Sequence, residues 1–193
     1  KNVTLKDIRT LCAWIQWEAA RFCVNNKLRT PLGKATETFI KIEGIIRDHA
    51  RLLTLKDKSK TKNYKHVLAN QRNVRILLGF MECLEKAIYN AAEGSAFAIP
   101  PPEKPARTFF RLNAATCNDW FNRNRLAIHQ LALHCMELEM VIRCSTSILK
   151  EMAAAGKVND TFFDQMLLSL TWALLRNFES DALVGEFDFF FKF

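Results

Sequence analysis

Glycine and proline are scarce in this sequence, with 6 Gly and 5 Pro among 193 residues. Because these residues supply many of the tight turns of β-proteins, their scarcity argues against a β-sandwich or a β-barrel. No run of about 18 apolar residues occurs, so we expect neither a transmembrane helix nor a membrane partner. Hydrophobic residues make up 49% and charged residues 25% of the chain, which argues against disorder and against a coiled coil. These proportions are typical of a helical protein with a core.

Motifs of common catalytic and nucleotide-binding sites are also absent. The sequence contains no GxGxxG, GxxxxGK[ST], HExxH or GxSxG pattern. The cysteines form no CxxC pair and no recognised zinc spacing with the four histidines. They fall within helical apolar patterns, so we expect buried reduced thiols in an intracellular protein. We therefore expect no catalytic residue, metal or cofactor in this segment. The six cysteines are Cys12, Cys23, Cys83, Cys117, Cys135 and Cys144.

Apolar residues recur at helical spacing in six stretches, which predicts about six main helices. We expect Gly44 at a close helix–helix contact, Gly156 at a helix end and Asp160 within a helix cap. The predicted helices cover residues 4–25, 31–53, 66–93, a stretch from between Phe109 and Thr116 to about Met136, 139–155 and 161–178. The predicted core includes Ile15, Phe22, Ile45, Leu78, Trp120, Ile128 and Leu170.

The arrangement of these helices predicts an α-solenoid of antiparallel pairs, HEAT-like or tetratricopeptide-like, with a closed bundle as the alternative. The first and last helices are apolar nearly all round, which favours the solenoid because an outer helix of a bundle has a polar face. We divide the chain into residues 1–98, a Pro-rich connector at 99–106, residues 107–182 and a Phe-rich tail at 183–193. The connector is expected not to be helical through Pro105. Since Lys1 opens the chain without an initiator Met or a signal-peptide pattern, we expect a fragment or a processed product.

Positive charge is concentrated between Lys27 and Arg75, where 13 Lys and Arg stand against 4 acidic residues. The remainder of the chain holds 15 basic and 16 acidic residues. The bland interpretation is a solvated lysine loop at residues 55–65. The alternatives are an acidic protein partner, or RNA or an inositol phosphate bound through counterion release. Contacts to phosphate or to an acidic partner are predicted at Lys56, Lys58, Lys60, Lys62, Lys65, Arg72 and Arg75.

Arg123 and Arg125 follow Trp120 and Phe121 and precede an apolar stripe. Arg123 shares a helix face with Asp119, four residues earlier, which favours an ion pair on the surface. The functional alternative is that Arg123 and Arg125 contact a partner.

Several segments, taken in order, resemble the helical part of the phosphatidylinositol-3-kinase-related kinases that act in nonsense-mediated mRNA decay. The resemblance covers about residues 11–152 and rests on scaffold sequence rather than on catalytic motifs. The segments are Trp14–Ala20 (WIQWEAA), Lys27–Gly33 (KLRTPLG), Ile42–Arg47 (IEGIIR), Leu84–Lys86 with Tyr89–Ala91, Arg107–Phe110, and Thr116–Phe121 with Arg123, Arg125 and Leu126.

The resemblance implies a HEAT-like or tetratricopeptide-like solenoid in a large Ser/Thr kinase whose kinase lobes lie outside this chain. It implies regulatory subunits and the rest of the kinase chain as partners, an RNA helicase substrate complex, and a cytoplasmic or also nuclear location. No residue here matches the phosphoryl-transfer motifs, so whether the chain counts as an enzyme depends on its parent. We therefore expect a scaffold that positions regulatory subunits and the kinase domain. The alternatives are a basic module that binds RNA or inositol phosphate, and a spacer without ligand.

Overall fold

The computed structural model describes residues 5–28, 35–54, 64–93 and 104–177. These residues form only helices, which confirms the all-α prediction. Outside them lie residues 55–63 of the predicted loop, the first part of the Pro-rich connector, the Phe-rich tail and the start of the second helix at Pro31. The loop was predicted to extend to Lys65, which is wrong at its end because α3 begins at Tyr64. The elements are α1 (Leu5–Phe22), the π-helix η1 (Cys23–Lys27), α2 (Ala35–Thr54), α3 (Tyr64–Glu93), α4 (Lys104–Leu112), α5 (Ala114–Cys135), α6 (Leu138–Ala154) and α7 (Thr161–Arg176).

The chain forms two compact units. Unit 1 comprises Lys1–His49 and Lys60–Asn124, and unit 2 comprises Ala50–Ser59 and Arg125–Phe193. Helix α5 thus contributes its first half to unit 1 and its second half to unit 2. The sequence predicted a division of the chain at the Pro-rich connector, which differs from the division into these two units. The predicted domain boundary stays a prediction.

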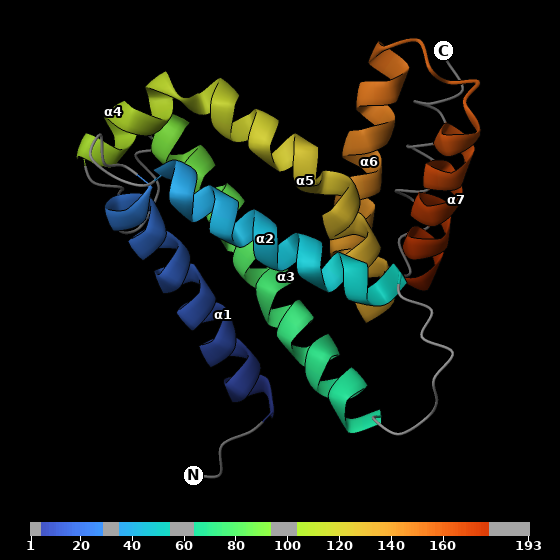
Figure 1. Cartoon of the computed structure of the whole chain (residues 1–193), viewed down its shortest axis with the longest axis horizontal. Coiled ribbons are helices and arrows are strands. Elements are labelled where there is room, and N and C mark those ends of the chain that lie inside the picture. The colour runs from blue at the N-terminus through green and yellow to red at the C-terminus, as the bar shows by residue number, and fades with distance from the viewer. Residues whose placement is uncertain (1–4, 29–34, 55–63, 94–103, 178–193) are drawn as a thin grey trace. The chain divides into compact units, whose positions relative to one another are not determined.

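In unit 1, α1 packs against α3, and the two helices run in the same general direction (Figure 1). Equivalent helices of successive pairs in a solenoid run this way. The Gln16 side chain donates a hydrogen bond from Nε2 to the carbonyl of Ile76 at 3.2 Å. Gly79 makes room for it, since a Cβ there would lie 2.7 Å from the Gln16 amide. The close contact predicted at Gly44 is wrong, because nothing lies within 4 Å of a Cβ built at that position.

The structure has two helices, α4 and α5, where the sequence predicted one. The break falls at Asn113, whose side-chain amide donates to the carbonyl of Phe109 at 2.8 Å. Helix α4 begins at Lys104, so the expectation that the connector is non-helical through Pro105 is wrong at its end. The reason is that proline is tolerated in the first turn of a helix, where its missing N–H has no intrahelical partner.

Helix α1 continues into the π-helix η1. The backbone N–H of Leu28 donates to the carbonyl of Cys23 at 2.9 Å, which is the five-residue spacing of a π turn. Val24 and Leu28 are buried in the core of unit 1. The predicted helix over residues 4–25 is therefore an α-helix followed by one wider turn.

In unit 2, α6 and α7 lie side by side and antiparallel (Figure 1). Asp160 caps α7 as predicted, because its Oδ1 accepts the N–H of Phe162 at 2.8 Å. Gly156 ends the α6 segment as predicted, with φ at 69°, a left-handed conformation that glycine adopts without strain. Together the two helices bury an apolar cluster of Ile148, Leu149, Phe163, Met166, Leu170 and Leu174.

The predicted core is partly right. Leu78, Trp120, Ile128 and Leu170 are buried, with at most 5% of each side chain exposed. Three others are corrections, since Ile15, Phe22 and Ile45 are 60%, 57% and 47% exposed. The reason is that the buried side of each helix differs from the predicted one. In α2 the buried residue is Ile46 rather than Ile45, and in α1 the buried face is the one that carries Ala20. Neighbouring residues in a helix are turned about 100° apart, so an apolar residue beside the buried one faces away from it.

Candidate interaction surfaces

The basic segment is only partly described by the structure. Lys56, Lys58, Lys60 and Lys62 lie outside the described residues, and Lys65 lies in the first turn of α3. Arg72 and Arg75 are exposed and, three residues apart on α3, share one side of that helix.

Two cations of α2 have acidic partners within the same segment. Lys41 pairs with Glu37 at 2.7 Å, and Arg47 pairs with Glu43 one turn away. Such exposed pairs contribute only about 0.2–1 kcal/mol to stability, but they lower the net charge that α2 presents. Helix α3 carries a similar pair, Lys86 with Glu82 at 2.5 Å, and also the exposed Arg72 and Arg75.

Arg123 is exposed on the part of α5 that belongs to unit 1, and Arg125 is half-buried at the start of the part in unit 2. Asp119 is exposed as well, and within the described length of α5 it makes no ion pair with Arg123. The expected intrahelical pair is thus wrong. A long exposed side chain loses rotamer entropy when it forms an ion pair. In water the Coulomb attraction gained is small and about offsets that loss.

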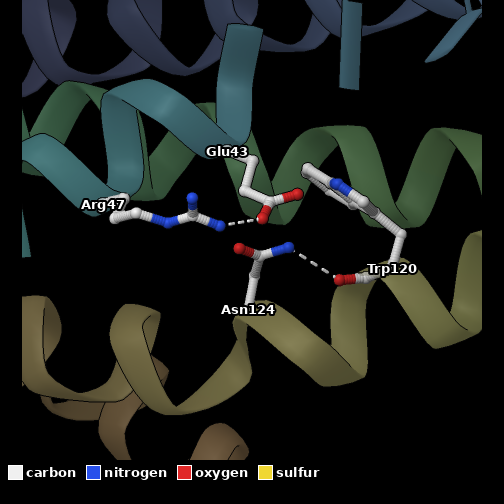
Figure 2. Close-up of polar contacts among 4 residues, drawn as sticks. All are labelled: Glu43, Arg47, Trp120 and Asn124. Atoms are coloured by element: carbon white, nitrogen blue, oxygen red, sulfur yellow. Dashed lines mark hydrogen bonds and ion pairs between the residues drawn. The ribbon is translucent and has the colours of Figure 1, made fainter. Parts of the chain in front are cut away.

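Figure 2 shows how α2 meets the first half of α5 in unit 1. The Glu43 carboxylate, which holds Arg47, points toward the side of α5 that carries Trp120 and Asn124. The Asn124 amide donates to the carbonyl of Trp120 at 2.8 Å, and both side chains are buried. The Phe39 ring lies 4.5 Å from the Trp120 ring, measured between centroids. The indole Nε1 of Trp120 is buried and has no hydrogen-bond partner among the described residues, so ring packing makes this contact.

Two helices carry large apolar side chains that are exposed in the part of the chain that the structure describes. On α1, Leu11, Trp14, Ile15 and Phe22 are 57–63% exposed. On α7, Leu168 and Leu175 are 71% and 58% exposed, and Trp172 between them is half-buried. The sequence signal was the apolar character of both helices nearly all round, which indicated contacts on two sides without saying which side lies in the core.

The six cysteines all lie within the described residues and form no disulfide there. Cys117, Cys135 and Cys144 are buried as expected, but Cys23 and Cys83 are half-buried and Cys12 is exposed. Burial raises the pKa of the Cys117 and Cys144 thiols to about 11, and it also raises the pKa of Cys23 and Cys83. Such thiols stay protonated near neutral pH and are poor nucleophiles.

His129 is buried in unit 2, where its Nε2 lies 2.9 Å from the Oγ of Ser169 on α7. Burial lowers the pKa of this imidazole, so the neutral form is favoured. Within the described residues, His, Cys, Asp and Glu side chains form no group of three that could hold a metal ion. None of the described helices is long and apolar enough to cross a bilayer.

Comparison with known proteins places this helical chain in a kinase family. A family model described as "SMG1: Serine/threonine-protein kinase smg-1" matches residues 1–187. The chain is 44% identical over 183 residues to "Serine/threonine-protein kinase Smg1" of Drosophila melanogaster, and 42% identical over 152 residues to "Serine/threonine-protein kinase SMG1" of Danio rerio. It is 29% identical over 177 residues to "Probable serine/threonine-protein kinase smg1" of Dictyostelium discoideum.

These matches cover between 76% and 92% of the chain but little of the relatives. The match to the Drosophila protein spans 92% of this chain and 6% of that protein, and the match to the zebrafish protein spans 76% and 4%. The family model extends beyond residue 152, where the motif resemblance ended, and includes α7. The chain belongs to the smg-1 family of serine/threonine-protein kinases.

Proposed function

We propose that the chain is a scaffold segment of a large serine/threonine kinase acting in nonsense-mediated mRNA decay, and that it positions regulatory subunits and the distant kinase domain. The observation that carries the proposal is the pair of uncovered apolar faces on α1 and α7, in units 1 and 2. A helix that packs on one side and remains apolar on the other is suited to contacts beyond its own pair. The match to a few per cent of much longer kinases supports the same function.

The cations of α3 are the surface that we assign to a regulatory subunit. Arg72 and Arg75 are exposed side by side, within the part of the sequence that holds 13 basic and 4 acidic residues. Opposite charge on a partner would raise the rate of association and select that partner against basic competitors. An RNA helicase substrate complex would then meet the kinase through the rest of the assembly.

The test is a calorimetric titration of the purified chain with each regulatory subunit of the kinase. We expect binding at micromolar concentration or below, weakened at least about tenfold when Arg72 and Arg75 are both replaced by Glu. The matched control replaces the exposed Lys150 and Lys157 of unit 2 by Glu, which changes the net charge equally. If the folded chain binds neither subunit at tens of micromolar, the docking part of the proposal is wrong.

A second candidate function is binding of RNA or an inositol phosphate, favoured by the same exposed Arg72 and Arg75. Affinity would then fall steeply with salt, because each neutralised phosphate releases counterions. Replacing Lys56, Lys58, Lys60 and Lys62 by Gln should reduce that salt dependence. If the chain still captures its partners from an extract after nuclease treatment, and binds neither RNA nor inositol phosphate at low salt, this candidate is wrong.

A further inference from the structure

The indole of Trp120 places a hydrogen-bond donor inside unit 1. Trp120 is 4% exposed, and its Nε1 has no hydrogen-bond partner among the described residues. Buried N–H groups are almost always paired in native proteins, because an unpaired donor loses the hydrogen bond that water would otherwise provide. An acceptor that reached this indole nitrogen would therefore stabilise the contact between α2 and the first half of α5.

Glu43 on α2 carries such an acceptor. One oxygen of its carboxylate accepts a hydrogen bond from Nη2 of Arg47. Figure 2 shows the other oxygen pointing toward the indole of Trp120. An ionised carboxylate has two oxygens and about four lone-pair sites, so it can accept from both donors at the same time. Glu43 can thus serve the indole without losing its ion pair.

Asn124 also has an acceptor at this contact, but its orientation turns that acceptor away. Its Nδ2 donates to the carbonyl of Trp120 at 2.8 Å, and Figure 2 shows its Oδ1 on the side away from the indole. Exchanging the two ends of the amide would set one carbonyl oxygen against another and lose that hydrogen bond. Among the four side chains drawn in Figure 2, Glu43 is therefore the acceptor suited to the indole.

The burial of Glu43 indicates where its contribution arises. Its side chain is 24% exposed, whereas that of Arg47 is 59% exposed. An exposed ion pair contributes little to stability, because water screens it and the side chains lose entropy. A hydrogen bond to an ionised acceptor is about twice as strong as a neutral one, and removal of water strengthens it further. The inward side of the Glu43 carboxylate should therefore matter more than its pairing with Arg47.

We propose that the second carboxylate oxygen of Glu43 accepts the indole N–H of Trp120 in the folded protein. One carboxylate then joins the exposed cation of Arg47 to a buried ring and holds α2 against α5 in unit 1. Glu43 acts as a positioning residue for the indole. The two residues come from Ile42–Arg47 and Thr116–Phe121, two of the segments that carry the family resemblance. The inference goes beyond the proposed function and does not depend on the docking of regulatory subunits.

The test compares two glutamates of α2, each paired with a cation four residues later: Glu43 with Arg47, and Glu37 with Lys41. Glu43→Leu should raise the equilibrium constant of unfolding in urea at least about fivefold more than Glu37→Leu, because only the former leaves a buried donor without an acceptor. Glu43→Gln should recover most of that difference, since its amide oxygen can still accept the N–H. Equal losses in the two leucine variants, or no recovery by glutamine, would overturn the proposal.

Two further measurements separate the hydrogen bond from packing. In a Trp120→Phe background, which keeps a ring but removes the N–H, the difference between Glu43→Leu and Glu37→Leu should disappear. A difference that persists there would assign the effect of Glu43 to packing, and the proposal would be wrong. In NMR spectra of the otherwise unchanged chain, the indole proton of Trp120 should move upfield in Glu43→Leu and stay in place in Glu37→Leu. An indole signal that Glu43→Leu leaves in place would also refute the proposal, even if Trp120→Phe failed to fold.

Discussion

The contact between α1 and α3 in unit 1 and that between α6 and α7 in unit 2 are built differently. In unit 2, large apolar side chains such as Leu170 and Phe163 fill the contact. In unit 1, Gln16 reaches across to the backbone of α3 over a glycine, while large apolar residues of α1 face outward. The comparison teaches that the size of an apolar residue does not identify the face that is buried, and that small residues can mark the contact instead.

The largest effect is expected at the aromatic contact of unit 1. Trp120→Ala should lower the free energy of unfolding by about 3–5 kcal/mol, because the indole is buried against the rings of Phe39 and Phe121. Trp14→Ala, at a tryptophan that is 63% exposed, should change it by less than about 0.5 kcal/mol. Urea unfolding followed by circular dichroism measures both, and equal losses would contradict the assignment of the two faces.

In unit 2, a buried and an exposed leucine can be compared within the single helix α7. Leu170→Ala should cost about 2–5 kcal/mol, because it leaves a cavity in the cluster between α6 and α7. Leu168→Ala, two residues away and 71% exposed, should cost little beyond its effect on helix propensity. Thermal unfolding of both variants is the measurement. A large loss at Leu168 in the isolated chain would show that its side chain is covered.

A pH effect is expected from unit 2. The pKa of His129 is lowered in the folded state by burial, so the unfolded chain binds the proton more tightly. The contribution of neutral His129 is therefore fully present above about pH 6.5, the pKa of an unperturbed histidine, and is lost as the pH falls through the folded-state value. The slope is at most about 1.4 kcal/mol per pH unit.

Unfolding at several pH values between about 5 and 7 tests this, because most carboxylates titrate below that range. His129→Gln should flatten the profile. A profile that His129→Gln leaves unchanged would assign the pH dependence to other groups.

Replacing Gly44 or Gly79 of unit 1 by alanine should change the free energy of unfolding by different amounts. Gly44→Ala should stabilise the chain by up to about 1 kcal/mol, because alanine is the better helix former and nothing lies near its Cβ. Gly79→Ala gains the same propensity but must displace the Gln16 amide, whose hydrogen bond is worth about 1 kcal/mol. We expect a net change near zero, and equal stabilisation by both would show that Gln16 moves without cost.

The sequence predicts the helices well because their apolar period and caps are local. Asp160 caps the start of α7, and Gly156 ends the α6 segment, as their residue types favour. It fails for Ile15 and Phe22 because a helix with two apolar sides contains two equally good stripes, and only tertiary packing decides between them. It also assigns the close contact to Gly44 instead of Gly79, since no local pattern reports what a distant helix places opposite a glycine.

For the surface residues, too, some features could be predicted from the sequence and others could not. The exposure of Arg72, Arg75 and Arg123 agrees with expectation, because arginine is rarely buried. The absence of an ion pair between Asp119 and Arg123 could not be predicted, since the small Coulomb attraction of an exposed pair is about offset by the loss of side-chain entropy. The break at Asn113 is accompanied by a side-chain hydrogen bond to the carbonyl of Phe109, a contact within the reach of many asparagines that remain helical, so it could not be predicted from the residue type.

The π turn that follows α1 bears on how the family can vary in length. A π turn accommodates one residue more than the α-helical turn that it replaces. Loss of one residue between Cys23 and Lys27 would therefore restore an ordinary α-helical turn and leave the residues after it in the same phase. Leu28, now completely buried, would stay in the core. This turn is thus a place where the chain can differ by one residue in length without changing which side chain meets α3.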